Sequence, residues 1–568
     1  MQAPTQHRLR QSLLCVSSGL LSALAFSTHS TGWLVWVSFV PWLYVLFRHQ
    51  KDHANASRWA LAKGFGFFSW IFGVSFYIGI IHWLKELHPL TWLPGVTTST
   101  SLLIVYGGIF GISLFVSLWS LLYGLVLGAS RPRGTWQVIL PAVLWMFMES
   151  FQAMGQMSLP WARLAISQYK NLWLLQIVPH TGQLVIGALI IALNAALARF
   201  VLAFGADPEP QPYWKYPGFR SGVSTLGVLA LLLGYGANRL QANPVPVPTD
   251  DDVQVAVVQG NIPQGQKWST SDEYWKNIAS IFEIYSNQTG QALRQTPQNK
   301  LDLVIWPESA LPLVVRHIPM YEQAFSQVAQ RTGGYFVSGT FDQEVFRESA
   351  IYNAAVLYDP KGQMQSWYYK RQLVPFGEFF PYRSTLESIP GLGMLIQKLN
   401  PMNSDTAAGT DPALFDTEFG KLGTQICFES VYPEVSRSSV KAGADMLVVI
   451  TNDGWYRDAI ALYQHLGHAV LRSLENQRYL ARAGNTGISA FIDPYGRILN
   501  QSLPLEETAL HRGISRSALQ NQPVTLYTRW GDWPLIPGFF ILLWGFIGGR
   551  KQRSAAAEAE NQPLTAEA

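Results

Sequence analysis

The chain has 568 residues, which is longer than one ordinary domain, and 14% of them are charged while 48% are hydrophobic. Soluble proteins carry about 25% charged residues, so this deficit indicates a membrane protein. The net charge is only +4, and the basic residues stand in short clusters between apolar segments. This pattern is typical of membrane loops and excludes an extended nucleic-acid-binding surface. The two cysteines lie in different regions, which excludes a disulfide framework.

Apolar segments approaching the length of about 20 residues that a membrane-spanning helix needs recur through the first 240 positions. The first two are short and joined by a polar turn, so they can form one tight hairpin. An eighth segment, Trp533–Ile547, follows a large polar region. The seven earlier segments are Leu13–Ser27, Trp33–Phe47, Phe65–Trp83, Leu102–Leu127, Trp136–Phe151, Leu184–Phe204 and Val223–Tyr235.

Basic residues are concentrated in alternate loops between these segments. Examples are Arg8 and Arg10 before the first segment, Arg131 and Arg133 after the fourth, and Arg550 after the last. The positive-inside rule therefore predicts that both termini are cytoplasmic and that the region between about 240 and 530 lies on the outer side. A cleavable signal peptide is not expected, because the first apolar segment runs into a second.

After a proline-containing linker, 241–252, the sequence pattern changes from long apolar segments to predicted strands that alternate with helices. We predict a transmembrane bundle at 1–240, an α/β domain at 253–528, a final membrane helix at 529–549 and a disordered cytoplasmic tail at 550–568. The expected strands are Val253–Gln259, Leu301–Trp306, Tyr335–Thr340, Tyr352–Tyr358, one that ends at Ile426, Met446–Ile450, Gly487–Ile492 and Arg497–Leu499. The expected helices are Ser271–Leu293, Tyr321–Arg331, Tyr432–Lys441 and Ala459–Arg482.

Three residues just past predicted strands are candidates for catalysis: Glu308, Lys370 and Cys427. A thiol at a strand end can act as a nucleophile if a carboxylate takes its proton and an ammonium stabilises the resulting oxyanion. Taken singly, each has a plainer reading as a loop carboxylate, a solvated lysine or a buried structural cysteine. The other cysteine, Cys15, stands in an apolar segment and is predicted to be a packing residue.

Short motifs around these candidates carry a specific resemblance. Trp306–Ser309, Tyr369–Glu378 and Ile426–Glu429 stand in the order Glu, Lys, Cys, which resembles the carbon–nitrogen hydrolase (nitrilase) superfamily with its αββα sandwich. The membrane bundle, Val258–Gln264 and Asn452–Tyr456 narrow the resemblance to the apolipoprotein N-acyltransferase family. The resemblance covers the chain up to its C-terminal tail. It implies a polytopic helical bundle of about eight spans with a nitrilase-like domain on the outer side of the bacterial inner membrane.

The resemblance also implies the site residues. Cys427 corresponds to the nucleophile, Glu308 to the general base and Lys370 to the oxyanion stabiliser. Glu378 and Glu429 match supporting carboxylates near the thiol. On the plainer reading, Glu378 is only a structural partner of Lys370, and Glu429 only holds a loop through backbone N–H groups.

Two tryptophans also match positions of the family, and one residue next to the nucleophile differs from its usual pattern. Trp268 and Trp455 match residues associated with substrate handling and lid movement, although both could be packing aromatics. The residue after the nucleophile is often tyrosine in the family but is Phe428 here, so no role for that hydroxyl can be carried over.

Apolar and aromatic residues outside the motifs suggest how lipid could reach the site. Phe379–Met402 is apolar for a loop and is predicted to be a lid that dips into lipid, with core packing as the alternative. Trp161 and Tyr169 are predicted to be interfacial anchors, or else to line a route for lipid. His465 and His468 lie within one helical turn, but no Cys or carboxylate completes a metal set, so both are predicted to be ordinary helix residues.

The function implied by the resemblance is a two-step acyl transfer without a cofactor. An acyl chain would pass from a membrane phospholipid, phosphatidylethanolamine, to a Cys427 thioester, and then to the N-terminal amine of a diacylglyceryl-cysteine on an apolipoprotein. The expected partners are these two substrates and membrane lipid, without nucleic acid, and the chain is expected to be a monomer. The alternatives are a membrane-tethered amidase or nitrilase that hydrolyses a C–N bond, and a transporter or scaffold with a degenerate outer domain.

Overall fold

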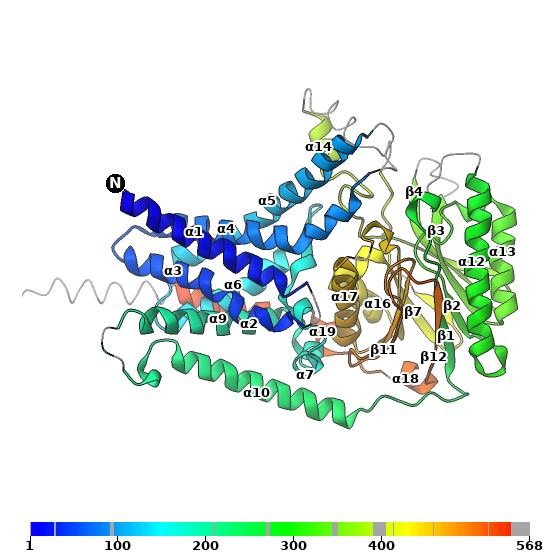
Figure 1. Cartoon of the computed structure of the whole chain (residues 1–568). Helices are drawn as coiled ribbons and strands as arrows, with labels where there is room; N and C mark the ends of the chain where they lie inside the picture. Colours follow the sequence, from blue (N-terminus) through cyan, green and yellow to red (C-terminus); the bar gives the residue numbers. More distant parts are fainter. Residues whose placement is uncertain are drawn as a thin grey trace, which may run out of the picture.

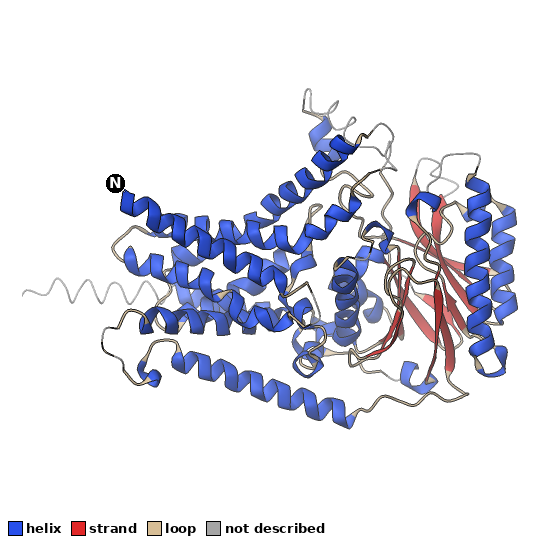
Figure 2. Cartoon of the chain, in the orientation of Figure 1, coloured by secondary structure: helices blue, strands red, loops and turns tan. Residues whose placement is uncertain are grey.

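A computed structural model describes the chain from its N-terminal helix to its last apolar helix (Figure 1). A helical bundle forms one half of the molecule and a two-sheet domain the other half (Figure 2). The predicted tail at 550–568 lies outside the described residues. The described residues are 2–27, 30–90, 96–207, 209, 211–267, 273–343, 350–389, 405–412, 414–457, 459–520 and 522–546.

Each of the seven apolar segments predicted in the first half overlaps a helix. Two of them coincide residue for residue with α6 (Trp136–Phe151) and α9 (Leu184–Phe204). Among the described residues, four helical segments are long and apolar enough to cross a membrane: 58–87, 98–130, 184–204 and 219–242. The total of eight spans stays a prediction. The remaining long helices are α1 (Gln2–Leu24), α3 (Val40–Asp52), α4 (Arg58–Ile81), α5 (Thr98–Ser130) and α10 (Phe219–Ala242).

The first two predicted segments do lie side by side, because α1 packs against α3 and α4. They are not a short hairpin, since α1 begins at Gln2. The second segment is divided into the 3-10 helix η1 (Gly32–Leu34), α2 (Val35–Ser38) and α3. The last predicted span, Trp533–Ile547, contains a shorter apolar helix at Leu535–Phe546.

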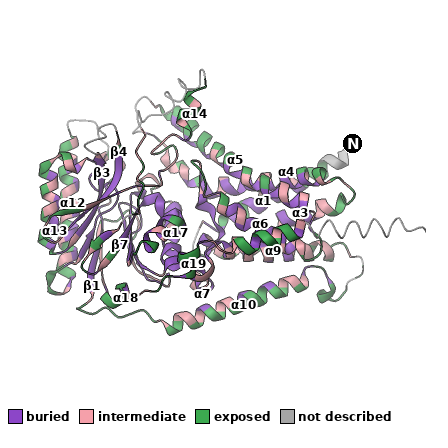
Figure 3. Cartoon of the chain, turned by 180° about the vertical axis from the view of Figure 1, so that it is seen from behind, coloured by how far each residue is buried: buried purple, intermediate pink, exposed green. Residues whose placement is uncertain are grey.

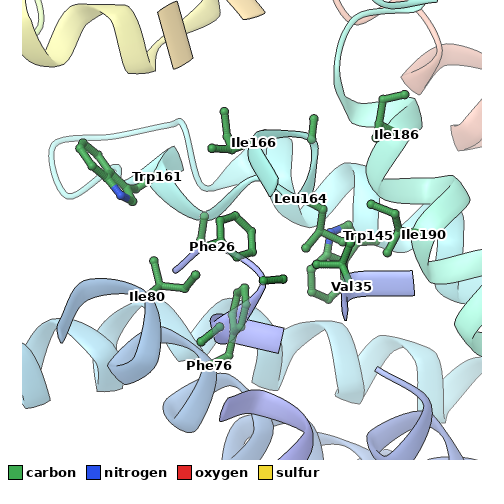
Figure 4. Close-up of a cluster of buried hydrophobic side chains, with 14 of the residues drawn as sticks. Phe26, Val35, Phe76, Ile80, Trp145, Trp161, Leu164, Ile166, Ile186 and Ile190 are labelled. Atoms are coloured by element: carbon green, nitrogen blue, oxygen red, sulfur yellow. The ribbon is translucent and has the colours of Figure 1, made fainter. Parts of the chain in front are cut away.

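The connection between α6 and α9 folds back over the end of the bundle that faces the sheets. It consists of η3 (Pro160–Ala162), η4 (Leu164–Gln168), α7 (Leu172–Leu175) and α8 (Val178–Thr181). Trp161, Leu164 and Ile166 from this connection join the buried cluster drawn in Figure 4. Trp161 and Tyr169 are only 2% and 8% exposed, so the prediction that they are interfacial anchors is wrong. Their apolar neighbours draw both rings into the core.

The second half contains two six-stranded sheets among the described residues. The first has the order β12-β1-β2-β3-β4-β5, with β1, β2 and β3 parallel. The second has the order β11-β10-β9-β8-β7-β6, with β7, β8 and β9 parallel. The strands of the first sheet are β1 (Val253–Gln259), β2 (Leu303–Ile305), β3 (Tyr335–Gln343), β4 (Ile351–Tyr358), β5 (Met364–Tyr369) and β12 (Thr508–Ile514). Those of the second are β6 (Phe415–Thr417), β7 (Gly420–Ile426), β8 (Met446–Thr451), β9 (Tyr479–Gly484), β10 (Ala490–Ile492) and β11 (Ile498–Gln501).

The two sheets pack face to face, and helices cover both outer faces. Val257 and Ile305 of the first sheet share a buried apolar cluster with Ile426 and Val448 of the second. Helices α12 (Tyr274–Gln295) and α13 (Pro319–Thr332) cover the first sheet, and α16 (Pro433–Lys441) and α17 (Ala461–Asn476) cover the second (Figure 1). The predicted αββα sandwich is therefore confirmed. The shorter helices are α11 (Gln264–Lys267), α14 (Arg383–Glu387), α18 (Arg516–Gln520) and α19 (Leu526–Trp530).

The longest predicted helix of this half, Ala459–Arg482, is wrong at its C-terminal end. Helix α17 ends at Asn476, Gln477 adopts a left-handed conformation, and Tyr479–Gly484 forms strand β9 in parallel with β8. Leu, Ala and Arg favour helices locally, but pairing with β8 in a fully buried position outweighs that preference. Strands β5, β6 and β12 were also not predicted. Of the predicted lid Phe379–Met402, residues 390–402 lie outside the described residues.

Helix α17 joins the two halves of the molecule. It is buried along both of its faces, with Leu466 and Val470 in one cluster with Trp161 and Ile166 of the bundle and with Leu447 and Leu480 of the second sheet. Figure 3 shows this contrast, because α17 is almost entirely buried while α12 and α13 expose their outer faces. One apolar core therefore extends from the bundle to the second sheet.

Candidate active site

Cys427 stands at the end of β7, a strand whose last five residues are buried. Its backbone adopts a φ of +54°, a left-handed conformation that costs a non-glycine residue energy and marks a sharp strand-to-helix turn. The residues that follow form the 3-10 helix η8 (Cys427–Val431). The side chain is 9% exposed, so the thiol is nearly enclosed.

Glu308 is held just beyond β2 by hydrogen bonds to both carboxylate oxygens. Its Oε2 accepts the backbone N–H of Asn452 at 2.7 Å, and its Oε1 accepts the side-chain amide of Asn353 at 2.8 Å. Gly339 of β3 passes close by, where a Cβ would lie 2.5 Å from the Glu308 Cα, so only glycine fits there. The carboxylate is thereby fixed in a buried position.

Lys370 lies between two carboxylates immediately after β5. Its Nζ is 2.9 Å from Glu378 Oε1 and 3.3 Å from Glu308 Oε1, and the side chain is 1% exposed. Burial opposes the charged form, but Glu308 and Glu378 outweigh it and hold the pKa of Lys370 well above its usual value. The lysine is therefore a permanent ammonium.

Cys427 interacts electrostatically with both Glu308 and Lys370, so the structure brings the three predicted catalytic side chains together. Burial raises the pKa of the thiol well above its usual value, and the negative charge of Glu308 raises it further, while Lys370 opposes this rise. The resting thiol is therefore protonated at neutral pH. A nucleophilic reaction at this sulfur requires a base to take its proton, and Glu308 is the adjacent carboxylate.

Glu429 is fully buried and acts as a clamp between two backbone segments. It accepts hydrogen bonds from the N–H groups of Ile426 at 2.7 Å and Arg371 at 2.7 Å, and from the Tyr368 hydroxyl at 2.7 and 2.8 Å. These contacts tie the end of β7 to the segment that carries Lys370. They match the plainer of the two predicted readings, in which the carboxylate holds loops through backbone N–H groups.

A second charged cluster, which the sequence did not reveal, lies behind the nucleophile. Asp453 Oδ2 is 2.7 Å from Arg482 Nη2, and its Oδ1 is 2.9 Å from His465 Nδ1. The His465 Nε2 lies 2.9 Å from the Ser430 hydroxyl and 3.1 Å from the carbonyl oxygen of Cys427. The prediction that His465 is an ordinary helix residue is therefore wrong, because it supports the turn that carries the thiol.

The charges of this second cluster are fixed by mutual pairing. Burial alone would raise the pKa of Asp453, but His465 and Arg482 hold it well below its usual value. Burial and the positive charge of Arg482 lower the pKa of His465, so the imidazole is neutral. The Ser430 hydroxyl donates to the carbonyl oxygen of Cys427 at 2.9 Å and lies 2.9 Å from His465 Nε2, so the hydroxyl and the imidazole together hold the turn that carries the thiol.

Comparisons with known proteins place this architecture in a family. The family model "Carbon-nitrogen hydrolase" matches residues 254–523, and "Apolipoprotein N-acyltransferase N-terminal domain" matches residues 18–196. The apolipoprotein N-acyltransferase of Geobacter metallireducens is 32% identical over 542 residues, which cover 94% of each chain. The chain belongs to the apolipoprotein N-acyltransferase family.

A second relative from the same family matches the chain over nearly its whole length. The apolipoprotein N-acyltransferase of Gloeobacter violaceus is 30% identical, and the match covers 97% of this chain and 96% of that protein. Among solved structures, Saccharomyces cerevisiae Nit3, a member of branch 10 of the nitrilase superfamily, matches with a TM-score of 0.37 and 16% identity over 47% of this chain and 92% of its own. With its long apolar helices, this family member is an inner-membrane protein.

Aromatic side chains connect the site of this acyltransferase family member to the bundle. Phe428 stacks on Trp161, with ring centroids 6.2 Å apart, and Trp161 Nε1 donates to Gln464 at 2.6 Å. Tyr456 meets Trp83 of the bundle edge to face at 4.6 Å. Phe428 is thus part of the contact between the two halves, which accounts physically for an apolar ring at that position.

The two predicted tryptophans have different outcomes. Trp455 is half-buried in η9 (Asp453–Trp455), the short helix that contains Asp453 and follows the Asn452 N–H donor to Glu308. In the sequence, Trp455 lies between Asp453 and His465 of the second cluster. Trp268 lies outside the described residues.

Lys267 is a buried lysine that sequence reasoning did not single out. Its Nζ donates to the backbone oxygen of Ser309, the residue after Glu308, at 2.9 Å. Burial lowers its pKa to about 7, although the negative charge of Glu308 opposes that shift. The only signal in the sequence was its position next to Trp268.

Proposed function

We propose that the chain transfers an acyl chain from a membrane phospholipid to the N-terminal amine of diacylglyceryl-cysteine on apolipoproteins, with Cys427 as the acyl carrier. The observation that carries the proposal is the arrangement of Glu308, Lys370 and Cys427, in a protein whose family is named for this reaction. A thioester intermediate lets one enclosed site serve two bulky substrates in turn, which gives ping-pong kinetics.

In the first step, Glu308 takes the thiol proton and the Cys427 sulfur attacks the ester carbonyl of the phospholipid. The oxyanion that forms lies beside the Lys370 ammonium, which stabilises it. Collapse of this intermediate breaks the ester C–O bond, and Glu308 returns its proton to the departing lysophospholipid oxygen. Cys427 is left as a thioester.

In the second step, the α-amine of the diacylated acceptor attacks the thioester carbonyl. Glu308 takes a proton from the attacking nitrogen, and Lys370 again stabilises the oxyanion. The C–S bond breaks, an amide is formed, and the proton on Glu308 returns to the Cys427 sulfur. The site then has the protonation state with which it began, so no cofactor is required.

The supporting residues fit this scheme. Glu378 keeps Lys370 charged when Glu308 becomes protonated, because its Oε1 remains 2.9 Å from the ammonium. Glu429 aligns the end of β7 with the Lys370 segment. We propose that Trp455 and Trp268 contact substrate, and that phosphatidylethanolamine is the acyl donor.

The proposed membrane arrangement follows the positive-inside rule. Residues 1–240 would contribute seven spans and residues 529–549 an eighth, joined by the linker 241–252 and the outer catalytic domain 253–528. Both termini would be cytoplasmic, and a monomer would be sufficient, because the site is built from one chain.

The test is to incubate the purified chain with phospholipid labelled in one acyl chain and to measure the mass of the peptide that contains Cys427. We expect an acyl adduct that disappears when a diacylated lipopeptide is added, as the label moves to its N-terminus. A Cys427→Ala variant should form neither product, while a Cys15→Ala variant should form both. Release of the label as free fatty acid in the presence of the lipopeptide would instead favour a hydrolase, such as the membrane-tethered amidase.

A further inference from the structure

A cavity of about 320 Å³ lies at the end of the helical bundle that points away from the sheets. It is formed where α3 and α5 end, where α6 begins and where α9 approaches its last residue. Its size is within the range of pockets that bind small ligands. The candidate catalytic residues follow strands β2, β5 and β7 of the sheet domain, which adjoins the opposite end of the bundle (Figure 1), so this cavity is not part of the active site.

The polar lining of the cavity is entirely basic or neutral. Four cations line it: Lys51, Arg131, Arg133 and Arg199. Within the described part of the chain, none of them makes an ion pair with a carboxylate. Asp52, the acid next to Lys51 in the sequence, is already bound by Arg48 at 3.0 Å. Four positive charges therefore converge without a compensating acid.

Several buried polar atoms in this lining have no hydrogen-bond partner. They are Nε and Nη2 of Arg131, Nε of Arg199 and Oε1 of Gln50. Gln50 is fixed by its other end, because its Nε2 donates to the backbone oxygen of Pro132 at 2.9 Å. Buried donors are almost always satisfied in folded proteins, so unpartnered guanidinium N–H groups indicate that a ligand with acceptor oxygens belongs here.

The rest of the wall is apolar and includes Phe47, Leu61, Leu202 and Pro217. A ligand that satisfies both parts of the cavity has an anionic group next to an apolar one. Phosphate in a lipid headgroup meets this requirement, because arginine binds phosphate oxygens in a forked geometry while the glycerol and acyl carbons contact the apolar wall.

We propose that this cavity binds the headgroup phosphate of an anionic phospholipid. Zwitterionic lipids fit it less well, because the cavity offers their ammonium no carboxylate. Free phosphate would leave the apolar wall uncovered. On the proposed orientation of the bundle, the bound lipid belongs to the cytoplasmic leaflet, on the opposite side from the acyl donor. The lipid would tie the ends of α3, α5 and α9 together.

The test measures retained lipid by native mass spectrometry of the full chain in detergent, in a Cys427→Ala background that prevents acyl transfer. The probes are phosphatidylglycerol, phosphatidylcholine with the same acyl chains, and inorganic phosphate as a competitor. The cavity variant is Arg131→Gln with Arg199→Gln. The matched control is Lys215→Gln with Arg220→Gln, which removes two exposed cations near the same end of the bundle without touching the cavity.

We expect the unsubstituted cavity and the control to retain phosphatidylglycerol in preference to phosphatidylcholine. Removal of two cations should weaken phosphatidylglycerol binding roughly 30-fold, since each basic residue near anionic lipid contributes about a fivefold change. Equal retention by the cavity variant and the control would overturn the proposal, and so would equal retention of the two lipids. Displacement of the lipid by millimolar inorganic phosphate would show that the cavity takes free phosphate, which also overturns it.

This result is independent of the proposed acyl transfer, because the measurement is made without the nucleophile. The thermal midpoint of the cavity variant, compared with that of the control, checks that the bundle still folds. If the variant unfolds, Arg131→Lys with Arg199→Lys provides the second measurement. Lysine keeps both charges but loses the forked geometry, so we expect a smaller loss of phosphatidylglycerol than with glutamine.

Discussion

Two charged clusters flank Cys427, and they differ in what their charges can do. In the front cluster, Lys370 is shared by the carboxylates of Glu308 and Glu378 at 3.3 and 2.9 Å. Either carboxylate can take up a proton while the other still pairs with the lysine. In the rear cluster, Asp453 is held by Arg482 and His465 at 2.7 and 2.9 Å, and every side chain is buried.

The two clusters differ in whether their groups can gain or lose a proton during a reaction. The front cluster has a surplus carboxylate next to a protonated thiol, so a proton can move within it during a reaction. The rear cluster has a depressed carboxyl pKa and a neutral imidazole, so neither group changes its charge near neutral pH. A buried pairing of carboxylates with basic groups thus suits proton transfer in the proposed reaction on one side and supports the turn at Cys427 on the other.

The largest effect is expected for Glu308→Gln. The amide is nearly the same size but accepts no proton, so we expect formation of the Cys427 acyl adduct to slow by about 10²–10⁴-fold. The amide oxygen still accepts from Asn452, but the new NH2 group faces two donors, the Asn353 amide and the Lys370 ammonium, so the thermal midpoint should also fall. Rapid-quench mass spectrometry gives the rate, and a loss of less than tenfold would mean that another group is the base.

Lys370→Met should reduce the same rate by about 10²–10³-fold, because the oxyanion loses its cation. It should also destabilise the fold by about 3–5 kcal/mol, the cost of leaving buried carboxylates unpaired. Adding Glu378→Gln to the Lys370→Met variant should restore part of the loss in thermal midpoint but none of the loss in rate. Recovery of the rate in the double variant would contradict the assigned role of the lysine.

Asp453→Asn tests the rear cluster through stability. Its folded-state pKa lies below the usual carboxyl value, so its stabilisation is complete above about pH 4 and disappears as the pH falls further. We expect a loss of about 3 kcal/mol at pH 7 from breaking a buried pair, with the gap between the two thermal midpoints narrowing below pH 4.

The control for this experiment is Asp416→Asn, which removes a surface pair with Lys421 and should cost less than about 1 kcal/mol. A gap between wild type and Asp453→Asn that stays constant with pH would show that Asp453 is not ionised in the folded protein.

The smallest effect is expected for Glu429→Gln. This variant separates a structural role of the Glu429 carboxylate from a direct role in acyl transfer. Glutamine keeps the shape and one acceptor oxygen, but it cannot accept from Ile426, Arg371 and Tyr368 together. We expect a loss of about 1–3 kcal/mol in stability and a change of only a few-fold in acyl-adduct formation. A loss of rate as large as that of Glu308→Gln would give Glu429 a direct part in the reaction.

The sequence was sufficient for the front cluster because Glu308, Lys370 and Cys427 each stand in a short motif just past a strand. It was not sufficient for the rear cluster. Asp453, His465 and Arg482 come from η9, α17 and strand β9, and β9 itself was predicted as helix. Only the pairing of β9 with β8 turns Arg482 toward Asp453, and such long-range pairing is not visible in local patterns.

The bundle shows the same limit. Each of the seven apolar segments predicted in the first half overlaps a helix, and two coincide with one residue for residue, because hydrophobic length is a local property. Arg131 and Arg133 were read as topological charges of one loop, and nothing in the sequence showed that they line a cavity with Arg199 of α9. Trp161 likewise looked like a surface aromatic until its packing against Phe428 placed it in the core.

Because one apolar core around α17 joins the two halves of this enzyme, we expect the sheet domain not to remain soluble without the bundle. A soluble fragment cut at residues 253–523 would expose Leu466, Val470 and the neighbouring apolar residues that Trp161 and Ile166 now cover. Such a fragment should aggregate, even though its two sheets and four main helices form a complete αββα sandwich. The sandwich therefore depends on the membrane bundle to cover one of its apolar faces.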